Sequence, residues 1–390
     1  MEEWKLTKIG SLCKRVCSGG TPKSTIEEYF GGDIPWLNTK EVNFNRIYST
    51  ESTISDAGLN NSSAKWIDKH SVIVAMYGAT AAKCAIGMIP MTTNQACCNL
   101  MVDENLADYR FIYYALTNSY STLASLANGG AQQNLNAQLI KDFEIPLPDL
   151  HTQHRIADIL TSIDDKIENN NRINHNLHNL AQELFNNNIA ENACRSSGWR
   201  SASLLDIAEY LNGLAMQKYP AINGEFSLPV LKIKELGQQA CDANSDRCTE
   251  SIPEQFIVKD GDIIFSWSGT LLVDFWCGGK CGLNQHLFKV SSDMYPNWFV
   301  YFWTKHHLDR FIRIAKDKAV TMGHIKRGDL GKAIVVIPED AVMNKLNGEI
   351  APLISECIER RIENRKLQGL RNSLLPKLMS GELEINDLTC

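Results

Sequence analysis

Short apolar runs, separated by Gly, Pro, Asn and Ser, fill the first part of the chain, from about residue 3 to residue 149. Three of them are IPWL (34–37), VIVAM (72–76) and CCNLMV (97–102). Runs of this length with turn residues at their ends favour strands, whereas DYRFIYYALTN (108–118) is predicted to be a helix. We therefore expect an α+β domain in this part of the chain.

Residues 201–340 repeat the same plan. A helix is expected near 297–315, and the predicted strands include LPVLKI (228–233), DIIFSW (262–267) and HLFKV (286–290). Dipeptides recur at one constant shift in the numbering, Asn94-Gln95 as Asn284-Gln285 and Leu147-Pro148 as Ile337-Pro338. A repeat this long is not one turn of a solenoid, whose repeats run to roughly 20–50 residues. The chain is predicted to be a duplicated module with two similar but unequal halves.

A heptad pattern follows each of the two domains. The first seam extends over about four heptads, at Ile156, Leu160, Ile163, Ile167, Asn170, Asn174, Leu177, Ala181 and Leu184. The second seam has Leu346, Ile350, Leu353, Cys357, Arg360, Asn364 and Leu367. Leu374-Leu375-Pro376 and Gly381 are expected to end the second helix, and Pro352 to kink it or to mark its start.

A single amphipathic helix would more often pack on its own domain. Two matched heptad helices in one chain can instead pair with each other, and the polar positions Asn170/Arg360 and Asn174/Asn364 would then set their register. These patterns divide the chain into a domain (1–150), a helix with a linker (151–198), a second domain (199–340), and a second helix with a C-terminal tail (341–390).

The composition of the 390 residues is that of a globular protein, with 44% hydrophobic and 22% charged residues. No apolar run has spanning length, and MEEWKLTKIG lacks the basic and apolar regions of a signal peptide, so we expect a cytoplasmic protein without membrane contact. The twelve cysteines include no CxxC pair, which argues against a structural metal site. The net charge of −6 is unusual for a nucleic-acid binder. If DNA is bound, basic groups must gather on one face, or partner subunits must supply much of the electrostatic attraction.

Long strings of the chain resemble the specificity subunits of type I restriction-modification systems. In the first half these are GGTPKSTIEEYFGGDIPWLNTKEV (19–42), AMYGATAAKCAIG (75–87), NQACCNL (94–100) and IPLPDLHTQHRIADILTSIDDKIENNNRINHNLHNLAQELF (145–185). In the second half they are LPVLKIKEL (228–236), GDIIFSWSGT (261–270), NQHLFKV (284–290) and NRKLQGLRNSLLPKLMSGEL (364–383). GLAMQK (213–218) departs from the pattern, because it stands where the first half has GGTPK.

The resemblance implies an α+β fold with two similar target-recognition domains, separated by two long antiparallel coiled-coil spacer helices and related by a pseudo-twofold internal repeat. It implies a non-catalytic subunit that recognises an asymmetric, bipartite site on double-stranded DNA. It also implies two methyltransferase subunits as partners, one for each half, and restriction (translocase) subunits. No cofactor is expected in this chain, whereas S-adenosylmethionine, ATP and Mg are expected on the partner subunits.

Candidate DNA-binding residues are polar or aromatic side chains at loop tips between apolar runs, where readout groups are displayed on a rigid scaffold. In the first domain they are Thr21, Lys23, Asn38, Thr39, Lys40, Tyr77, Thr80, Asn94, Gln95, Gln132, Gln133 and Asn134. In the second they are Gln217, Lys218, Lys232, Lys234, Trp267, Ser268, Thr270, Asn284, Gln285, His324 and Lys326. The Asn-Gln pair is identical in both halves, so a structural or backbone-positioning role is as good a hypothesis as base readout. Tyr77 and Trp267 could equally stack on a base or cap the core.

A competing hypothesis is a self-contained DNA-modifying or nicking enzyme. Pro148-Asp149 and Asp164-Asp165-Lys166 mimic the pattern of metal-dependent nucleases, but Asp164 and Lys166 are expected to face solvent on the first heptad helix. The pairs His151/His154 and His175/His178 lack a third ligand and are expected to be helix-surface residues. Neither a glycine-rich phosphate loop nor an Asn-Pro-Pro-Tyr-like tetrapeptide is found, so we predict neither catalytic nor metal-binding residues.

Overall fold

The computed structural model describes residues 4–128, 135–191, 198–317 and 323–383. The chain forms two compact units. The first unit comprises Met1–Asp165 together with Gly369–Cys390, and the second comprises Lys166–Gln368. Each unit therefore contains one α+β domain and a part of each long helix, and the division differs from the four consecutive segments expected from the sequence.

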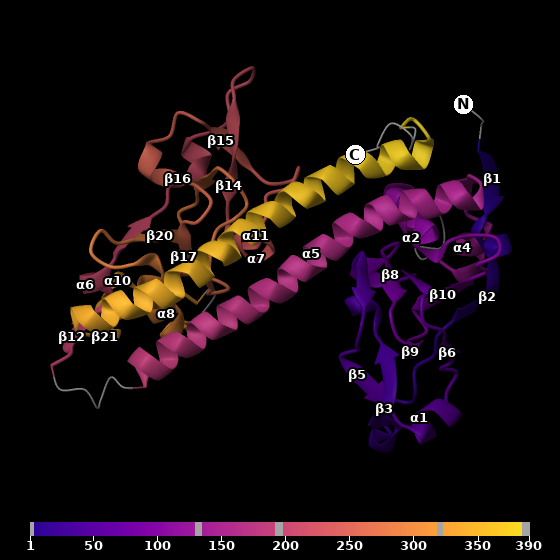
Figure 1. Cartoon of the computed structure of the whole chain (residues 1–390), viewed down its shortest axis with the longest axis horizontal. Coiled ribbons are helices and arrows are strands. Elements are labelled where there is room, and N and C mark those ends of the chain that lie inside the picture. Colours follow the sequence, from indigo (N-terminus) through magenta and orange to yellow (C-terminus); the bar gives the residue numbers. More distant parts are fainter. Residues whose placement is uncertain (1–3, 129–134, 192–197, 318–322, 384–390) are drawn as a thin grey trace. The chain divides into compact units, whose positions relative to one another are not determined.

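The first unit contains two larger sheets, with strand orders β2-β10-β7-β8-β4 and β5-β3-β9-β6, and a two-stranded sheet β1-β11 (Figure 1). Its strands are β1 (Lys5–Lys8), β2 (Cys13–Ser18), β3 (Phe30–Leu37), β4 (Asn45–Ile47), β5 (Ser52–Ile54), β6 (Trp66–Ile67), β7 (Val72–Ala75), β8 (Cys84–Gly87), β9 (Met91–Thr93), β10 (Cys97–Val102) and β11 (Glu144–Leu147). Its shorter helices are α1 (Asp56–Asn60), α2 (Tyr109–Asn118), α3 (Tyr120–Asn128) and α4 (Ala137–Asp142). The helix predicted over 108–118 is confirmed by α2.

Strand β7 shows why the apolar runs of this domain do not alternate with polar residues. All four of its side chains are buried, and successive ones enter different cores: Val72 and Val74 pack under α2 with Phe111, whereas Ile73 and Ala75 pack with Leu37 on the other face of the sheet. Side chains alternate between the two faces of a strand, so a strand covered on both faces is continuously apolar.

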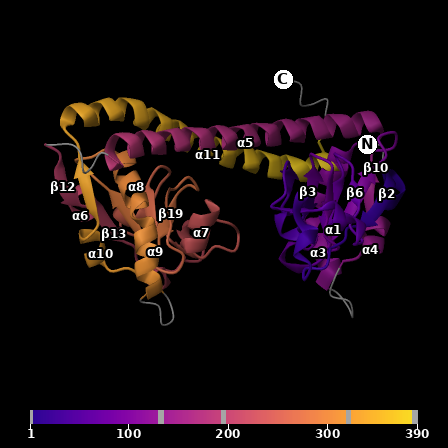
Figure 2. The same cartoon turned by 90° about the horizontal axis from the view of Figure 1, so that it is seen from below.

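The second unit has the same strand topology. Its sheets are ordered β13-β20-β17-β18, β15-β14-β19-β16 and β12-β21, which repeats the first unit apart from the additional β4 there. The strands are β12 (Arg200–Ser203), β13 (Glu209–Asn212), β14 (Ser227–Leu231), β15 (Arg247–Thr249), β16 (Ile257–Val258), β17 (Ile263–Ser266), β18 (Val273–Phe275), β19 (Cys281–Leu283), β20 (Leu287–Ser291) and β21 (Ile334–Ile337). The helices are α6 (Leu204–Ile207), α7 (Ile233–Gln238), α8 (Asn297–His306), α9 (Leu308–Asp317) and α10 (Arg327–Gly331). Helices α8 and α9 follow each other across a break at His307, where one helix was predicted (Figure 2).

The two long helices are α5 (Leu150–Phe185) and α11 (Asp340–Ser380). Pro352 does not mark the start of α11, because the helix begins at Asp340. The prediction that Leu374-Leu375-Pro376 helps to end the helix is wrong, because it continues to Ser380. The last turns persist because Leu375, Leu378 and Met379 are buried in the core of the first unit. Gly381, with φ +72°, then ends the helix as expected.

Helices α5 and α11 pair in antiparallel fashion within each unit. In the first unit, Asp164 of α5 meets Arg371 of α11, and in the second unit Asn170 meets Asn364. The predicted seam is buried from Ile156 to Asn170, but its end shifts: Ala181, Phe185 and Ile189 are fully buried, whereas Leu184 is half-buried. This last stretch packs on the aromatic side chains of α8 rather than on a heptad partner, which explains the change of period.

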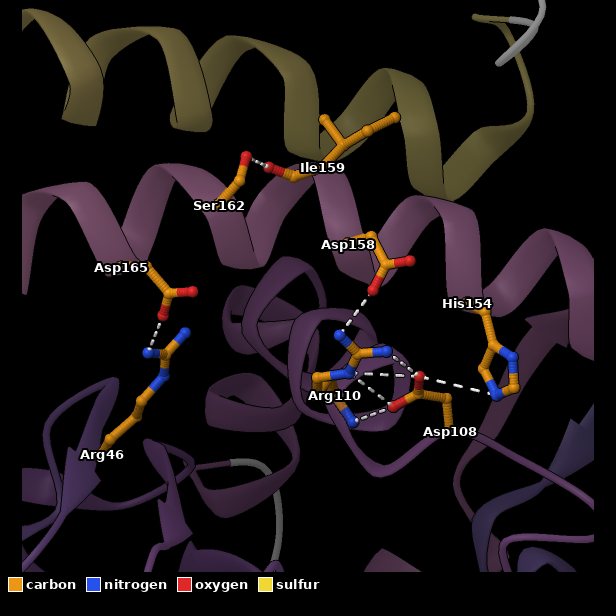
Figure 3. A network of polar contacts seen from close by, with 8 residues as sticks. All are labelled: Arg46, Asp108, Arg110, His154, Asp158, Ile159, Ser162 and Asp165. Carbon is orange, nitrogen blue, oxygen red and sulfur yellow. Dashed lines mark hydrogen bonds and ion pairs between the residues drawn. The ribbon is translucent and has the colours of Figure 1, made fainter.

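Polar contacts fasten α5 to the first domain (Figure 3). Arg46 of β4 pairs with Asp165, and Arg110 of α2 bonds both to Asp108, which caps the same helix, and to Asp158 of α5 at 2.6 Å. Asp108 is almost fully buried and also faces His154 at 3.8 Å. The α+β fold with two similar domains and two long helices is thus confirmed. In the part of the chain that the structure describes, we find no helix with the length and apolarity to cross a membrane.

Candidate nucleic-acid interface

The predicted DNA-binding residues of the first domain lie on loops that leave one edge of its sheets. Cys97 and Cys98, at the start of β10, pair with Ala75 at the end of β7 and with Ser18 at the end of β2. The parallel strands β3 and β9 end side by side at Leu37 and Thr93. The loops after β2, β3, β7 and β9 therefore emerge together, although they are far apart in the sequence.

Direct contacts join these loops. The Oγ1 of Thr80 donates to the carbonyl of Thr39 at 2.9 Å, and the Thr21 hydroxyl meets the Gln95 amide. Asn38 caps the short 3-10 helix Thr39–Glu41, because its side chain accepts from the backbone N–H of Lys40. The exposed predicted residues are Thr21, Lys23, Lys40, Tyr77 and Gln95, the partly buried ones are Asn38, Thr39 and Thr80, and Asn94 is buried. Gln132, Gln133 and Asn134 lie outside the described residues.

The second domain brings its loops to the same edge. Leu287 and Phe288, at the start of β20, pair with Ser266 at the end of β17 and with Asn212 at the end of β13. Strands β14 and β19 end side by side at Leu231 and Leu283. The predicted residues of the second domain thus follow strand ends equivalent to those of the first.

An aromatic and hydroxyl cluster connects the second set of loops. The indole of Trp267 donates to Asn212 Oδ1 at 3.0 Å and lies 6.3 Å from the His324 ring. Ser268 is bonded to His286 Nδ1 at 3.1 Å. The exposed predicted residues are Gln217, Lys218, Lys234, Thr270 and Lys326, the partly buried ones are Lys232, Trp267, Gln285 and His324, and Ser268 and Asn284 are buried.

The repeated Asn-Gln dipeptide forms the turn between two buried strands in both domains. Asn94 is 9% exposed and its Oδ1 accepts from the N–H of Ala96 at 3.1 Å, while Asn284 is 4% exposed and its Oδ1 accepts from the N–H of His286 at 3.2 Å. Each asparagine N–H also bonds to the end of the neighbouring parallel strand. These contacts favour the structural hypothesis for the asparagines, because the amide oxygen already serves the turn.

Three of the predicted lysines are paired with carboxylates. Lys40 contacts Glu51 at 2.6 Å, Lys234 contacts Asp242 at 3.4 Å, and Lys232 pairs with Asp246. The hydrogen bond with Glu51 raises the pKa of Lys40. Exposed ion pairs of this kind contribute little to stability, so a phosphate group could replace the carboxylate at small cost. Over the whole chain, acidic residues outnumber basic ones, with a net charge of −6.

Residues of the competing enzyme hypothesis have structural partners. Asp149 caps α5 through Thr152. The prediction that Asp164 faces solvent is wrong: its side chain is 13% exposed, and it accepts from the Tyr114 hydroxyl at 2.6 Å and from Arg371 at 2.7 Å. Lys166 is half-exposed and lies 3.5 Å from Glu363.

His178 is not a simple surface residue either. It lies 3.1 Å from both the Tyr301 hydroxyl and the Lys305 ammonium, and burial, assisted by Lys305, lowers its pKa to about 4. Among the described residues, no group of three His, Cys, Asp or Glu side chains is placed to hold a metal ion.

Sequence reasoning missed several residues of these faces. Asn212 and His286 hold Trp267 and Ser268, and Asp246 faces Lys232. His286 directly follows the repeated Asn284-Gln285, which was an available signal. No sequence signal marked Asp246, because its position opposite Lys232 depends on the pairing of β14 with β15.

Comparisons with known proteins agree with the geometry. Residues 1–179 match the family model of the type I restriction modification DNA specificity domain. The chain is 27% identical to the type I restriction enzyme MjaIX specificity subunit of Methanocaldococcus jannaschii, over 99% of this chain and 95% of that protein. It is 30% identical to the EcoR124I/EcoR124II specificity subunit of Escherichia coli over 42% and 41% of the two chains. The fold matches the crystal structure of a type I restriction-modification S subunit from M. genitalium with a TM-score of 0.61 and 17% identity, over 96% of each chain.

Proposed function

We propose that this chain, which belongs to the specificity subunits of type I restriction-modification systems, recognises a bipartite, asymmetric DNA target with one α+β domain for each half. The observation that carries the proposal is the equivalence of the two loop edges. Strand order and loop positions repeat, whereas the side chains on the loops differ, as in Tyr77 against Trp267 and Lys23 against Gln217. Two domains with the same strand order but different loop side chains suit two half-sites of different sequence.

The proposed role is recognition without catalysis. The carboxylates Asp149 and Asp164, which a nuclease-like pattern would require, are engaged in a helix cap and in an ion pair with Arg371. Metal-dependent hydrolysis requires carboxylates that converge on a metal with an open coordination position. The structural contacts therefore support the non-catalytic proposal over a self-contained modifying or nicking enzyme.

Catalysis would then belong to partner subunits. We place two methyltransferase subunits against this chain, one for each half, and restriction (translocase) subunits in the cleaving complex. S-adenosylmethionine, ATP and Mg would be bound by those subunits. The similarity to subunits of restriction enzymes supports this assignment. The net charge of −6 supports it too, because partners would have to supply part of the attraction to phosphate.

Methylation-site sequencing of DNA modified by this chain with its cognate methyltransferase tests the proposal. We expect a split target with two different half-sites and a gap of unread base pairs between them. A continuous site or a perfect palindrome would refute the proposal. Incubation of the purified chain alone with DNA, Mg and S-adenosylmethionine should give neither methylation nor strand breaks, and any turnover would favour the enzyme hypothesis.

A further inference from the structure

A cavity of about 290 Å³ opens beside the candidate DNA-binding loops of the second domain. Its volume is at the lower end of the range for small-ligand pockets, which suits a ligand of a single ring system. The loop after β13, strand β14, strand β15 and the turn before β20 all contribute to it. Its walls are formed by Met216, Gln217, Pro220, Val230, Lys232, Asp246, Arg247 and Asn284.

The first domain has an indole at the place that corresponds to this cavity. Val230 of β14 pairs with Gly282 of the parallel strand β19, and Trp36 of β3 pairs in the same register with Thr92 of β9. Trp36 is 8% exposed, and its Nε1 donates to the carbonyl of Gly20 at 2.9 Å, in the loop after β2. The indole thus spans the space between strand and loop that valine is too small to fill in the second domain.

The backbone frame around this space is alike in both domains. Gly19 and Gly213 begin the equivalent loops. A Cβ at Gly19 would lie 2.1 Å from the carbonyl oxygen of Thr93, and a Cβ at Gly213 would lie 2.2 Å from the carbonyl oxygen of Asn284. No side chain fits at such a short distance, so in each domain the loop begins directly against the turn that contains the Asn-Gln dipeptide. The two loops therefore start from equivalent places, and the exchange of Trp36 for Val230 is a difference beside that common start.

The walls of the cavity combine apolar side chains with hydrogen-bond donors and acceptors. Met216 and Val230 are buried in one apolar cluster and close the floor of the cavity. Asn284 is 4% exposed, and because its Oδ1 accepts from the N–H of His286, the Nδ2 hydrogens are the donors that remain. Lys232 and Asp246 form an ion pair at the same cavity, and Gln217 adds an exposed amide.

This chemistry suits a nucleobase better than an anion. A base has two apolar faces and an edge with both donors and acceptors, and the cavity provides apolar walls together with amide, ammonium and carboxylate groups. Both cations of the cavity have partners, since Arg247 donates to Ser227 and Lys232 pairs with Asp246, whose carboxylate would repel a phosphate group. A base paired within the duplex has its Watson–Crick edge occupied, so only a base that has left the stack can use such a pocket.

We propose that this cavity receives one nucleobase turned out of the duplex at the second half-site, which rests on the DNA-recognition function proposed above. One face of the base lies against the apolar floor formed by Met216 and Val230, and its freed Watson–Crick edge bonds to the Gln217 amide, the Asn284 Nδ2 and the Lys232–Asp246 pair. Turning out the base costs unstacking and unpairing, and these contacts offset that cost. The first domain captures no base at this position, because Trp36 occupies it.

The test uses the complete complex with its methyltransferase subunits and the target found by methylation sequencing. Val230→Trp copies the first domain and fills the cavity. Binding is measured on the intact target and on a series of duplexes, each with one abasic nucleotide in the second half-site. We expect the variant to bind the intact target about ten-fold more weakly. At one abasic position its affinity should return to within about two-fold of that of the unchanged complex, because no base then needs the pocket.

Gln217→Ala provides a second variant that cannot fail through overpacking, since Gln217 is exposed. It should weaken binding to the intact target and have no effect on the duplex that lacks the captured base. A base turned out by the methyltransferase serves as an internal control, because its removal should change binding of both variants and of the unchanged complex equally. If no abasic position removes the effect of either variant while the unchanged complex still prefers its target, the pocket proposal is wrong. If the unchanged complex shows no preference for the target, the DNA-recognition function itself is overturned.

Discussion

The amide oxygen of Asn170 accepts a hydrogen bond from Arg360 at 2.9 Å, and these two residues hold the same position in the two repeats. The Nδ2 of Asn170 donates to Asn364 at 2.9 Å and to Glu363 at 2.7 Å. Asn170 is fully buried, so these bonds specify how α5 and α11 align in the second unit. The predicted register role is supported for Asn170, whereas the side chain of Asn174 has no hydrogen-bond partner among the described residues.

Asn170→Leu should lower the free energy of unfolding by about 1–3 kcal/mol, because Arg360 and Asn364 would keep buried polar groups without their partner. Urea unfolding followed by circular dichroism measures the change. Asn176→Leu is the matched control at an exposed position of the same helix and should change stability by less than about 0.5 kcal/mol. Equal losses for the two variants would contradict a specific role of Asn170.

Asp164→Ala should destabilise the first unit by about 3 kcal/mol. It leaves the Tyr114 hydroxyl and the Arg371 guanidinium without their shared carboxylate in a largely buried position. Thermal or urea unfolding of the chain tests this. Asp158 on the same helix is 65% exposed, and its partner Arg110 also pairs with Asp108, so Asp158→Ala should cost no more than about 1 kcal/mol. A small effect at Asp164 would show that the ion pair contributes little.

Stability should fall on mild acidification. The pKa of His178 is lowered from 6.5 to about 4, first by burial and then by the charge of Lys305. Burial likewise lowers the pKa of His307 to about 4. Between these values the unfolded chain binds protons that the folded chain does not, so stability is fully present above about pH 6.5 and decreases as the pH falls toward 4.

Unfolding measured from about pH 7.5 to pH 4.5 checks this dependence. His178→Gln should flatten the decrease, because the titrating ring is removed. His175→Gln, on an exposed position of the same helix, serves as the control and should leave the decrease unchanged. Identical pH profiles for His178→Gln and the unchanged chain would contradict the assignment.

Lys40→Ala should weaken binding of the methyltransferase complex to all DNA sequences and reduce the slope of log affinity against log salt by about one. Lys8 is a matched control, because it is also exposed, pairs with Asp142 at 3.0 Å, and lies on β1, away from the loop edge. Gln133→Ala, outside the described residues, should cost about 1–3 kcal/mol on the first half-site only, if its amide reads an adenine. Equal losses on cognate and scrambled duplexes for both Lys40→Ala and Gln133→Ala would contradict the division into backbone-positioning and base-reading groups.

Exchange of residues 1–150 for the corresponding domain of a relative should change one half-site and leave the other. Each unit has its own core, which allows the recognition loops to be exchanged with their scaffold. The exchange should succeed best when the incoming domain keeps partners for Asp158, Asp164 and Asp165 on α5, at the places of Arg110, Tyr114 and Arg46. Methylation sequencing reads both half-sites, and simultaneous changes in both would refute their independence.

The duplication, the strands with long apolar runs, the two long helices and the positions of several loops could be predicted from the sequence. Each of these depends on local periodicity, such as the continuous apolar run of β7 or the heptads from Ile156 to Asn170, and such periodicity is visible in a short window of residues. The repeated Asn94-Gln95 and Asn284-Gln285 marked equivalent turns for the same reason.

Only the tertiary structure decided which polar side chains face solvent and which have partners within the chain. Asp164 looked like a surface residue of a helix, yet Tyr114 and Arg371 meet there from distant parts of the chain. The contrast between Trp36 and Val230 was likewise present in the sequence, but it became a cavity only once the register of β3 and β14 and the loops after β2 and β13 were known. Burial and pairing are properties of residues that are close in space, and local spacing cannot specify them.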